Sequence, residues 1–372
     1  MSALLVVAGE ASGDRAAAAV VARLQDHAAF GLGGPALARA GTELVSDLRD
    51  VTAMGIGEAS RRAFATAIAF ARVLRGVRKR RPKAALLVGY TEFNARLAPW
   101  LRRASVRVVW YCAPQVWAWR PGRAKTLAPL VDRMAVVLPF EARLWRNAGA
   151  DATYVGHPAL ETPLLPRADA RRALGMTPYA SGIAILPGSR PHEVRRLLPP
   201  MLAAYRLLFR DRAAVDARIL VAPSLDAGTR RHVQSLAERN RVATYDVDPA
   251  DGAMPVLPAF EVALCASGTA SLEAAIAEAV PVVAYRVGLT TEIAARVLLR
   301  VRHIALPNIL LGRSAFAEVL QRDVAPQKLH DALVRALDDR PARLVACREV
   351  TAALGDERRP SARVAEMLAP WL

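Results

Sequence analysis

Residues 262–286 constrain the fold most strongly, because two short apolar runs enclose a helical segment there. The first run, 262–265, predicts a buried strand, and Ser267, Gly268 and Thr269 predict a tight turn. A helix then extends to Glu278, and Pro281 stands at the entry of a second strand. A strand, a helix and another strand in this order form a βαβ unit.

The turn formed by Ser267, Gly268 and Thr269 has two interpretations. Its small residues let backbone N–H groups approach a ligand, and the positive end of the following helix favours an anion. Glu273, one turn inside that helix, is placed to accept hydrogen bonds from sugar hydroxyls. The alternative is a capped helix with Ser267 or Thr269 as the N-cap, since short glycine-containing turns have many uses.

Strand and helix patterns alternate along both halves of the chain. The predicted strands cover 4–8, 84–88, 106–111, 133–138, 183–186, 219–222, 243–247, 262–265 and 281–284. This alternation predicts an α/β protein with two Rossmann-like, doubly wound domains that face a cleft. We expect the domains at 1–165 and 166–344, a Pro- and Arg-rich linker at 161–180, and helices from about 345 to 372 that pack back on the first domain.

Length and composition limit the remaining possibilities. A chain of 372 residues favours two domains, and no apolar run approaches the ~20 residues of a membrane-spanning helix. The first nine residues lack a basic segment and predict a strand, not a signal peptide. Cys112, Cys265 and Cys347 are far apart in the sequence, which suggests neither a disulfide framework nor a metal site and indicates a reducing cytoplasm.

The net charge of +17 allows nucleic acid or an anionic membrane as a partner. Nucleic acid is the less favoured, because the sequence has no nucleic-acid-binding signature with interleaved aromatic residues. Codon usage that favours Arg and Ala is a further explanation of the charge.

The predicted helix 59–80 concentrates this positive charge. Phe64 and Ile68 lie on its apolar stripe. The basic residues in it and directly after it are Arg61, Arg62, Arg72, Arg75, Arg78, Lys79, Arg80 and Arg81. Such a helix either lies on anionic lipid or packs in the core with a solvated basic face, and both interpretations require the same amphipathic pattern.

Loops follow most of the predicted strands. The glycine-rich loop 30–35 lacks the order and the acidic ribose partner of a dinucleotide site, so we interpret it as a close-approach loop beside a ligand. Further loops are expected at 9–14, 89–94 and 306–309, and further helices at 15–26 and 287–300. His157, directly before Pro158, is predicted to make a structural hydrogen bond, with a catalytic base as the alternative.

The motifs together resemble those of the lipid-A-disaccharide synthases, a family of inverting glycosyltransferases with the GT-B fold. They run nearly end to end, at 8–14, 54–56, 114–120, 138–141, 155–157, 186–190 with Glu193, 266–270 with Glu273, 282–286, 306–308 and 326–329. The resemblance implies transfer of 2,3-diacylglucosamine from its UDP derivative to 2,3-diacylglucosamine 1-phosphate, which forms the β-1,6 disaccharide of lipid A and releases UDP. Negative charge that grows on the leaving phosphate needs fixed donors more than a metal, so we expect no metal and no other cofactor.

The resemblance also implies which residues contact the substrates. The nucleotide is expected on the second domain, at Gly188, Ser189, Arg190, Glu193, Ser267, Gly268, Thr269, Glu273, Asn308 and Gln327. The acceptor is expected to enter from the first domain beside helix 59–80, and the candidate substrate contacts there are Ser12, Gly13, Trp117 and Arg120. Since both substrates carry acyl chains anchored in a bilayer, the resemblance favours a cytoplasmic protein attached peripherally to the anionic inner membrane. Exchange of C-terminal segments in the family suggests a homodimer.

One departure from the family concerns the catalytic base. The family carries an aspartate in a Gly-Ile-Asp-Ala-Pro-Asp-Phe-Asn loop, and alignment on 92–94 puts Gly89 at its position. Glu92 is then the first candidate for the base, followed by Asp14 and Glu10, because parallel sheets gather strand-end loops at one edge. The alternative function is a diverged nucleotide-sugar or lipid-binding protein of the same fold without this turnover.

Overall fold

The computed structural model describes residues 3–24, 26–49, 59–212, 214–286 and 302–372, which divide into two compact units. Unit 1 comprises Met1–Glu161 and Leu354–Leu372, and unit 2 comprises Thr162–Ala353. The first boundary thus falls between 161 and 162, where the sequence predicted 165 and 166. The chain returns to unit 1 at Leu354, whereas the expected position was near 345.

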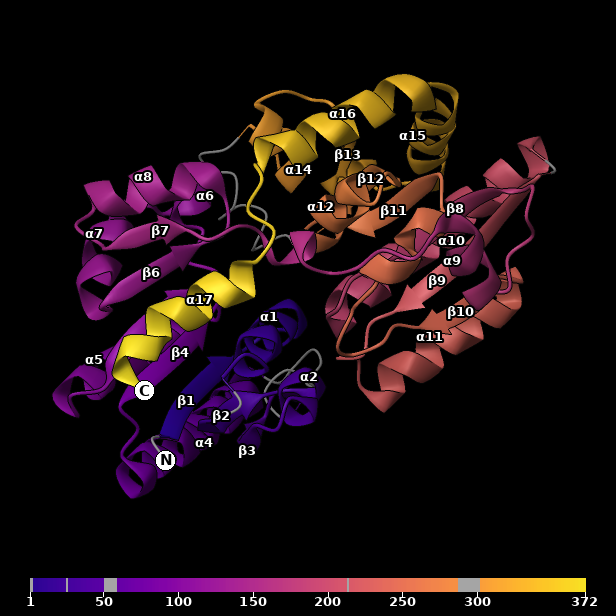
Figure 1. The fold of residues 1–372 in the computed structure, drawn as a ribbon. Coiled ribbons are helices and arrows are strands. Elements are labelled where there is room, and N and C mark those ends of the chain that lie inside the picture. Colours follow the sequence, from indigo (N-terminus) through magenta and orange to yellow (C-terminus); the bar gives the residue numbers. More distant parts are fainter. Residues whose placement is uncertain (1–2, 25, 50–58, 213, 287–301) are drawn as a thin grey trace. The chain divides into compact units, whose positions relative to one another are not determined.

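Unit 1 contains a seven-stranded parallel sheet with the order β3-β2-β1-β4-β5-β6-β7 (Figure 1). Its strands are β1 (Ala3–Ala8), β2 (Ala28–Gly33), β3 (Glu43–Asp47), β4 (Ala84–Val88), β5 (Arg107–Tyr111), β6 (Arg133–Val136) and β7 (Ala152–Tyr154). Its described helices are α1 (Ala11–Val21), α2 (Pro35–Arg39), α4 (Ala59–Arg80), α5 (Thr91–Arg103), α6 (Val116–Trp119), α7 (Ala124–Leu127), α8 (Pro139–Asn147) and α17 (Pro360–Leu368), with short 3₁₀ turns that include η1 (Pro121–Arg123). The strand order reverses beside β1, which pairs with both β2 and β4 and creates the switch point of a doubly wound sheet.

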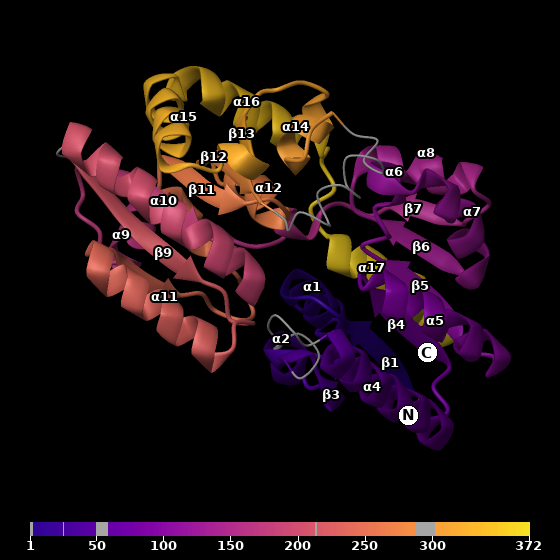
Figure 2. The ribbon, with the colours of Figure 1, turned by 180° about the vertical axis from the view of Figure 1, so that it is seen from behind.

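The sheet of unit 1 is covered on both faces. Helices α1 and α17 lie on the face in front in Figure 1, and α4 and α5 lie on the face in front in Figure 2. Strands covered in this way are apolar along their whole length, and every residue of β4 is buried. The core includes Phe30, Trp110 and Trp145, which are almost fully excluded from solvent.

Unit 2 contains a six-stranded parallel sheet with the order β10-β9-β8-β11-β12-β13. Its strands are β8 (Ser181–Leu186), β9 (Val215–Val221), β10 (Ala243–Asp246), β11 (Val262–Ala266), β12 (Val280–Tyr285) and β13 (Ala317–Leu320). Its described helices are α9 (Arg167–Ala173), α10 (Pro191–Asp211), α11 (Ala227–Asn240), α12 (Thr269–Ile276), α14 (Leu306–Leu311), α15 (Pro326–Asp338) and α16 (Arg340–Ala353). The order reverses beside β8, which pairs with β9 and β11 and gives this unit its own switch point.

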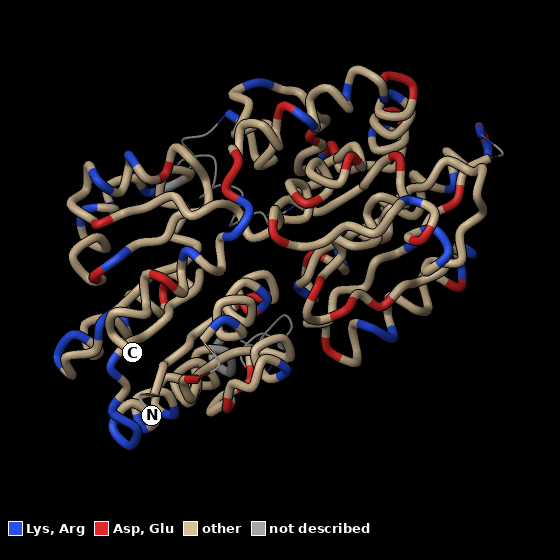
Figure 3. Tube along the Cα trace, in the orientation of Figure 1, with Lys and Arg blue, Asp and Glu red and all other residues tan. Residues whose placement is uncertain are grey.

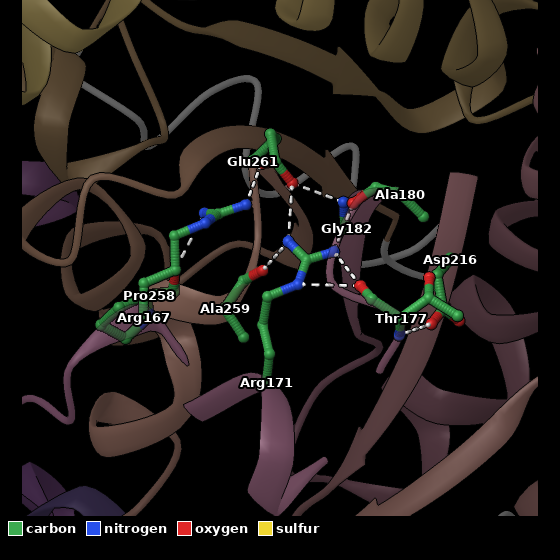
Figure 4. A network of polar contacts seen from close by, with 9 residues as sticks. All are labelled: Arg167, Arg171, Thr177, Ala180, Gly182, Asp216, Pro258, Ala259 and Glu261. Atoms are coloured by element: carbon green, nitrogen blue, oxygen red, sulfur yellow. Dashed lines mark hydrogen bonds and ion pairs between the residues drawn. The ribbon is translucent and has the colours of Figure 1, made fainter. Parts of the chain in front are cut away.

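A buried guanidinium ties together the edge of unit 2 where the strands begin (Figure 4). Arg171, on α9, donates to the carbonyl oxygens of Thr177 at 2.9 Å, Ala259 at 3.0 Å and Ala180. Glu261 lies 3.7 Å from the same guanidinium and accepts a hydrogen bond of 2.5 Å from the backbone N–H of Gly182. The segment that the sequence predicted as a linker therefore contains a helix whose arginine holds the sheet edge.

The C-terminal segment belongs to unit 1. Helix α17 contacts α1 and β5. Glu161 accepts hydrogen bonds from the backbone N–H of Ser361 at 3.0 Å and from its hydroxyl at 2.6 Å. The hydroxyl of Tyr154 donates to the carbonyl of Leu354 at 2.5 Å. For residues 354–372 the return to unit 1 is thus observed, whereas α16 belongs to unit 2.

Helix α4 combines a packed stripe with exposed apolar side chains. Ala69, Val73 and Val77 are buried against β2 and β3, so the core-packing interpretation holds for this stripe. Phe64 is 70% exposed and Ile68 is 37% exposed, and core packing does not account for them. Figure 3 shows the basic residues at the C-terminal end of this helix gathered near the start of the chain. No helix among the described residues is long and apolar enough to cross a membrane.

Several sequence-predicted loops are regular structure. Residues 30–33 belong to β2. A Cβ atom at Gly31 would lie 1.7 Å from the carbonyl oxygen of Val6, so only glycine allows β2 to approach β1 this closely at that position. The 89–94 loop ends at Tyr90, since α5 begins at Thr91. The helix expected at 15–26 begins earlier, at Ala11. The segments 54–58 and 287–300 lie outside the described residues.

The predicted loop 306–309 is helix α14, which begins at Leu306. Pro307 in its first turn is compatible with a helix start. Glu318, on β13, accepts hydrogen bonds from the backbone N–H groups of Ile304 and Ala305 at 3.0 and 3.1 Å and so caps the segment that enters α14. This cap comes from a distant strand, which explains why the local sequence did not reveal it.

Candidate active site

Two turns of unit 2 meet at the edge where its strands end. Strands β8 and β11 are neighbours in register, with Leu186 beside Cys265. Gly188 and Ser267 each lie two residues beyond these paired positions. In an open α/β sheet, ligands bind outside the carboxyl ends of the strands at the switch point, and β8 and β11 lie at that point in unit 2.

The turn before α12 leaves room for a ligand. Gly268, not Ser267 or Thr269, is the N-cap residue, and its φ of 140° is unfavourable for other residues. Among the described residues, a Cβ atom at Gly268 would meet no atom within 4 Å, so none of them fills the space beside this helix N-terminus. The hydroxyl of Ser267 donates to the carbonyl of Ile304 at 3.3 Å, which holds the segment before α14 against the turn. Glu273 is buried inside α12.

The turn before α10 is occupied by its own glutamate. Glu193 accepts hydrogen bonds from the backbone N–H groups of Ser189 and Arg190 at 3.2 and 3.3 Å, and the Arg190 guanidinium donates to it at 3.1 Å. A Cβ atom at Gly188 would lie 2.4 Å from a carboxylate oxygen of Glu193, so glycine is required there. The sequence predicted Ser189 and Arg190 as nucleotide contacts. For their backbone amides this is corrected, because Glu193 already accepts hydrogen bonds from both at the start of α10.

Asn308 is a structural residue, which corrects its predicted role as a substrate contact. Its amide nitrogen donates to the carbonyl of Phe316 at 3.0 Å and to Glu318 at 2.8 Å. Its side-chain oxygen accepts from the backbone N–H groups of Ala315 and Phe316 at 3.0 and 2.9 Å. An asparagine side chain has two donors and two acceptor positions, so none is left for a ligand.

Gln327 lies exposed in the first turn of α15. Its amide nitrogen lies 2.9 Å from a carboxylate oxygen of Asp331 and 3.3 Å from a ring nitrogen of His330. These contacts occupy the donor side of the amide.

In unit 1, the turns after β1 and β4 lie side by side. Ala8 is the register partner of Val88, and a Cβ atom at Gly9 would overlap the Tyr90 ring at 2.1 Å. Glu10 is exposed directly after this contact. Ser12 and Gly13 lie in the first turn of α1, and a Cβ atom at Gly13 would be 3.4 Å from Val88.

Asp14 is buried and caps α2. Its carboxylate accepts hydrogen bonds from the backbone N–H groups of Gly34 at 2.6 Å, Ala36 at 2.9 Å and Leu37 at 3.4 Å. Burial raises the pKa of this carboxyl despite these hydrogen bonds. The contacts explain why an aspartate is needed at this position without a catalytic role.

Glu92 lies in the first turn of α5 and binds an arginine. Arg123, on η1, donates to its two carboxylate oxygens at 2.5 and 3.3 Å. This hydrogen bond is the main reason why the pKa of Glu92 lies below its usual range, and the charges of Arg123, Arg96 and Arg120 add to the effect. Gly89, the position at which the family resemblance implies an aspartate, has a φ of 53°, and a Cβ atom there would meet none of the described residues within 4 Å.

Trp117 is anchored by a buried carboxylate that the sequence analysis did not include among the site residues. Its indole N–H donates to Glu141 at 2.9 Å, and its ring packs edge-on against Phe140. Glu141 is fully buried, and burial raises its pKa to about 7. A Pro followed two residues later by Glu at a helix start was the available signal, since it is typical of a capping box. Arg120 follows α6 and is exposed.

His157 is buried beside the N-terminus of a short 3₁₀ turn. Its Nδ1 atom accepts a hydrogen bond of 3.2 Å from the backbone N–H of Ala159, and burial lowers its pKa to about 4. The predicted structural role fits this geometry. Among the described residues, no group of three or more His, Cys, Asp or Glu side chains is arranged to hold a metal ion.

Comparison with known proteins identifies the family. The model of the lipid-A-disaccharide synthetase family matches residues 4–367. A lipid-A-disaccharide synthase of Anaeromyxobacter dehalogenans (strain 2CP-C) is 42% identical over 98% of this chain and 96% of the relative. The chain belongs to the lipid-A-disaccharide synthetase family. It is therefore a hexosyltransferase of lipid A biosynthesis, with a nucleotide-sugar donor and a sugar acceptor.

Solved structures of low sequence identity share the fold. The UDP-GlcNAc 2-epimerase of Neisseria meningitidis, bound to UDP-GlcNAc, has a TM-score of 0.59 and 12% identity, with all of both chains covered. The spinosyn rhamnosyltransferase SpnG has a TM-score of 0.60 and 14% identity and covers 99% of this chain and 100% of its own. The predicted pair of Rossmann-like domains of the GT-B class is confirmed at the level of the fold.

Proposed function

We propose that this family member joins 2,3-diacylglucosamine, delivered as its UDP derivative, to 2,3-diacylglucosamine 1-phosphate. The products are the β-1,6 disaccharide and UDP. The observation that carries the proposal is the open turn at Gly268, at the switch point of unit 2, in a chain that matches the family over residues 4–367. A mass-spectrometric assay with purified protein and both acyl sugars tests it. Failure to form the disaccharide would favour the alternative of a diverged binding protein.

UDP is proposed to bind unit 2 at the N-terminus of α12. The helix dipole and the N–H groups of its first turn favour the diphosphate there, and Glu273 is proposed to accept hydrogen bonds from the ribose. The Arg190 guanidinium and the Ser189 hydroxyl are the remaining candidates from the turn before α10, since Glu193 uses its amides. Calorimetry with UDP in EDTA tests whether binding is independent of metal. Loss of binding on chelation would overturn this part.

The proton of the acceptor hydroxyl needs a base as the new bond forms. We propose Glu92 for this role, with Glu10 as the next candidate, because both follow neighbouring strands of unit 1. Asp14 is the weakest of the three, since backbone N–H groups of α2 occupy both its oxygens. The alternative for Glu92 is that it only holds Arg123 in place.

Gly89 allows a direct test of where the base lies. Aspartate tolerates the left-handed backbone conformation, and the space beside Gly89 is open, so Gly89→Asp is expected to fold. If Glu92 serves as the base, the added carboxylate does not raise turnover. A large gain in turnover on Gly89→Asp would instead show that the protein lacks its base, and Gly89→Asn would control for the change in shape.

Membrane attachment is proposed to be peripheral and to use α4. The exposed side chains of Phe64 and Ile68 are available to enter the lipid interface, and the basic residues of the helix favour anionic headgroups. Co-sedimentation with anionic vesicles should fall at high salt and in a variant with Arg61, Arg62, Arg72 and Arg78 changed to Gln. A protein that stays free of such vesicles at low salt would overturn the proposal. A homodimer is proposed from the family resemblance alone, and light scattering tests it.

A further inference from the structure

Glu141 and Trp117 form a contact between two segments that both follow strands of the unit 1 sheet. Tyr111, the last residue of β5, is the register partner of Ala135 in β6. The chain reaches α6 soon after β5 and α8 soon after β6. The indole N–H of Trp117 on α6 donates to the Glu141 carboxylate on α8 at 2.9 Å.

The other carboxylate oxygen of Glu141 serves the start of its own helix. It accepts hydrogen bonds from the backbone N–H groups of Leu138 at 3.0 Å and Val137 at 3.3 Å. Both oxygens therefore face N–H donors, and three donors in all converge on a side chain with no exposed surface. An ionised carboxylate satisfies all three, because it only accepts hydrogen bonds.

Helix α6 is too short to be stabilised by its own hydrogen bonds. It has four residues, and its N-cap Gln115 makes no side-chain capping hydrogen bond. A helix of one turn gains almost nothing from its own hydrogen bonds. Val116 anchors this turn in the core of unit 1, and contacts with α8 orient the Trp117 side chain through the hydrogen bond to Glu141 and the edge-on packing against Phe140 at 5.1 Å.

We propose that Glu141 is a positioning residue for the acceptor: its carboxylate fixes the Trp117 side chain, and with it the segment from 116 to 120, at the sheet edge of unit 1. The acceptor sugar then meets a preformed surface, so binding loses less free energy in ordering that surface. This inference rests on the proposed function and on the sequence-based expectation that Trp117 and Arg120 are substrate contacts in unit 1.

Protonation of Glu141 weakens the arrangement. A protonated carboxyl places one O–H opposite an N–H donor, so one of the three hydrogen bonds is lost. Burial raises the pKa of Glu141 to about 7, which brings this change into the neutral range. Among the described residues, Cys112 and Tyr154 interact electrostatically with Glu141, and burial raises the pKa of both groups, that of Tyr154 to about 12. Neither group ionises near neutral pH, so a change in the Trp117 environment near pH 7 reports on Glu141.

The first experiment needs no substrate. The fluorescence of the wild-type protein minus that of Trp117→Phe isolates the Trp117 indole, and we expect this difference to titrate near pH 7. In Glu141→Gln the difference should be independent of pH. A signal from Trp117 that stays constant between pH 5.5 and 8.5 in the wild type would overturn the proposal.

The second experiment uses turnover. Glutamine offers one oxygen and one NH₂ group, so it leaves a donor facing either the indole or the Leu138 amide. Glu141→Gln should raise the acceptor KM about tenfold, with little change in the donor KM or in kcat. In the Trp117→Phe background the same substitution should add nothing. Additive effects of the two substitutions would overturn the positioning role, and Tm measurements identify any variant that is merely unfolded.

The two experiments also separate this proposal from the proposed function. A protein that forms no disaccharide while Trp117 titrates near pH 7 would contradict the function and leave the Glu141–Trp117 contact standing. A protein that is fully active, with an acceptor KM unaffected by Glu141→Gln, would contradict the positioning role alone.

Discussion

The buried carboxylate of Glu141 in unit 1 and the partly buried carboxylate of Glu261 in unit 2 lie in opposite kinds of surroundings. Glu261, at the edge where the strands begin, faces the guanidinium groups of Arg167 and Arg171 (Figure 4). Among the described residues, Glu141, after the end of a strand, accepts hydrogen bonds from neutral N–H donors, those of Trp117, Val137 and Leu138. Both groups connect two segments of the chain, but only Glu261 has opposite charges beside it.

The neighbouring charges account for this contrast. A neighbouring cation favours the ionised form of a carboxylate more strongly than neutral donors do. Neutral donors offset burial only in part, and the pKa of Glu141 therefore rises to about 7. Glu92 is a third case, because it pairs with Arg123 but is exposed on the surface of unit 1.

Glu92 offers the largest expected effect and tests whether an arginine-paired carboxylate can still act chemically. If it is the base, Glu92→Gln should lower turnover by roughly 10²–10⁴ and leave UDP affinity unchanged. A general base must be deprotonated, and Arg123 lowers the pKa of Glu92, so the acid limb of kcat/KM should lie below the usual glutamate range. Arg123→Gln should move that limb to higher pH.

Arg123→Gln also serves as the matched control for Glu92. If the pair only holds η1 against α5, both substitutions should give the same small loss of activity and no shift of the pH profile. Equal effects would show that Glu92 has a structural role, and Glu10 would then be tested in the same way.

Arg171 should have the largest effect on stability. Arg171→Met removes the donor from the carbonyl groups of Thr177, Ala180 and Ala259 and leaves Glu261 with one arginine. Breaking a buried ion pair from one side costs about 3–5 kcal/mol in the free energy of unfolding. Urea denaturation of the full chain measures it.

Arg167→Met provides the control for Arg171. Arg167 pairs with the same Glu261 but is more exposed, with 42% of its side chain accessible. An exposed pair contributes about 0–1 kcal/mol. Equal losses in the two variants would show that the carbonyl contacts of Arg171 do not matter.

Glu141 and His157 predict opposite dependences of stability on pH. The folded-state pKa of Glu141 is raised from 4.5 to about 7, so its contribution is present below pH 4.5 and is lost as pH rises to 7. The folded-state pKa of His157 is lowered from 6.5 to about 4, so its contribution is present above pH 6.5 and is lost as pH falls to 4. The two effects oppose each other between pH 4.5 and 6.5.

Two variants separate the opposing effects. In Glu141→Gln only the pH-dependent contribution of His157 remains. The stability of this variant relative to the wild type should therefore rise by about 3 kcal/mol from acid to neutral pH. His157→Asn keeps an acceptor for the Ala159 N–H and leaves the Glu141 term, so its relative stability should fall with pH by a similar amount. If the free energy of unfolding depends on pH in the same way in all three proteins, the assigned pKa shifts are contradicted.

Glu273 extends the comparison to a buried carboxylate whose proposed partner is a ligand. Glu273→Ala should weaken UDP binding by roughly 1.5–3 kcal/mol if the carboxylate accepts ribose hydroxyls. Calorimetry measures the affinity. Glu278→Ala is the control, because Glu278 follows the same helix but pairs with Arg348 on α16. An unchanged affinity in a folded Glu273→Ala protein would show that Glu273 does not bind the ribose and has only a structural role in α12.

The sequence was sufficient to predict the alternation of strands and helices in both units, because apolar runs and helical periods are local properties of the chain. It also located the turns at Gly188 and Gly268 and the departure at Gly89, since each is visible as residue identity. Tertiary structure alone decided what these residues do. The Asn308 amide is fully bonded to Ala315, Phe316 and Glu318. Glu193 accepts from the backbone amides of Ser189 and Arg190, and Asp14 caps α2.

The partners of Asp14 and Asn308 lie 7 or more residues away, so no local spacing rule could reveal them, whereas Pro191 and Glu193 carry the same local signal as Pro139 and Glu141. Helix α14 was missed because its cap is supplied by Glu318 from outside the helix. Glu141 shows the limit most clearly. A glutamate at a helix start predicts a cap, but only the approach of the Trp117 indole and the exclusion of water make it a carboxylate that titrates near neutral pH.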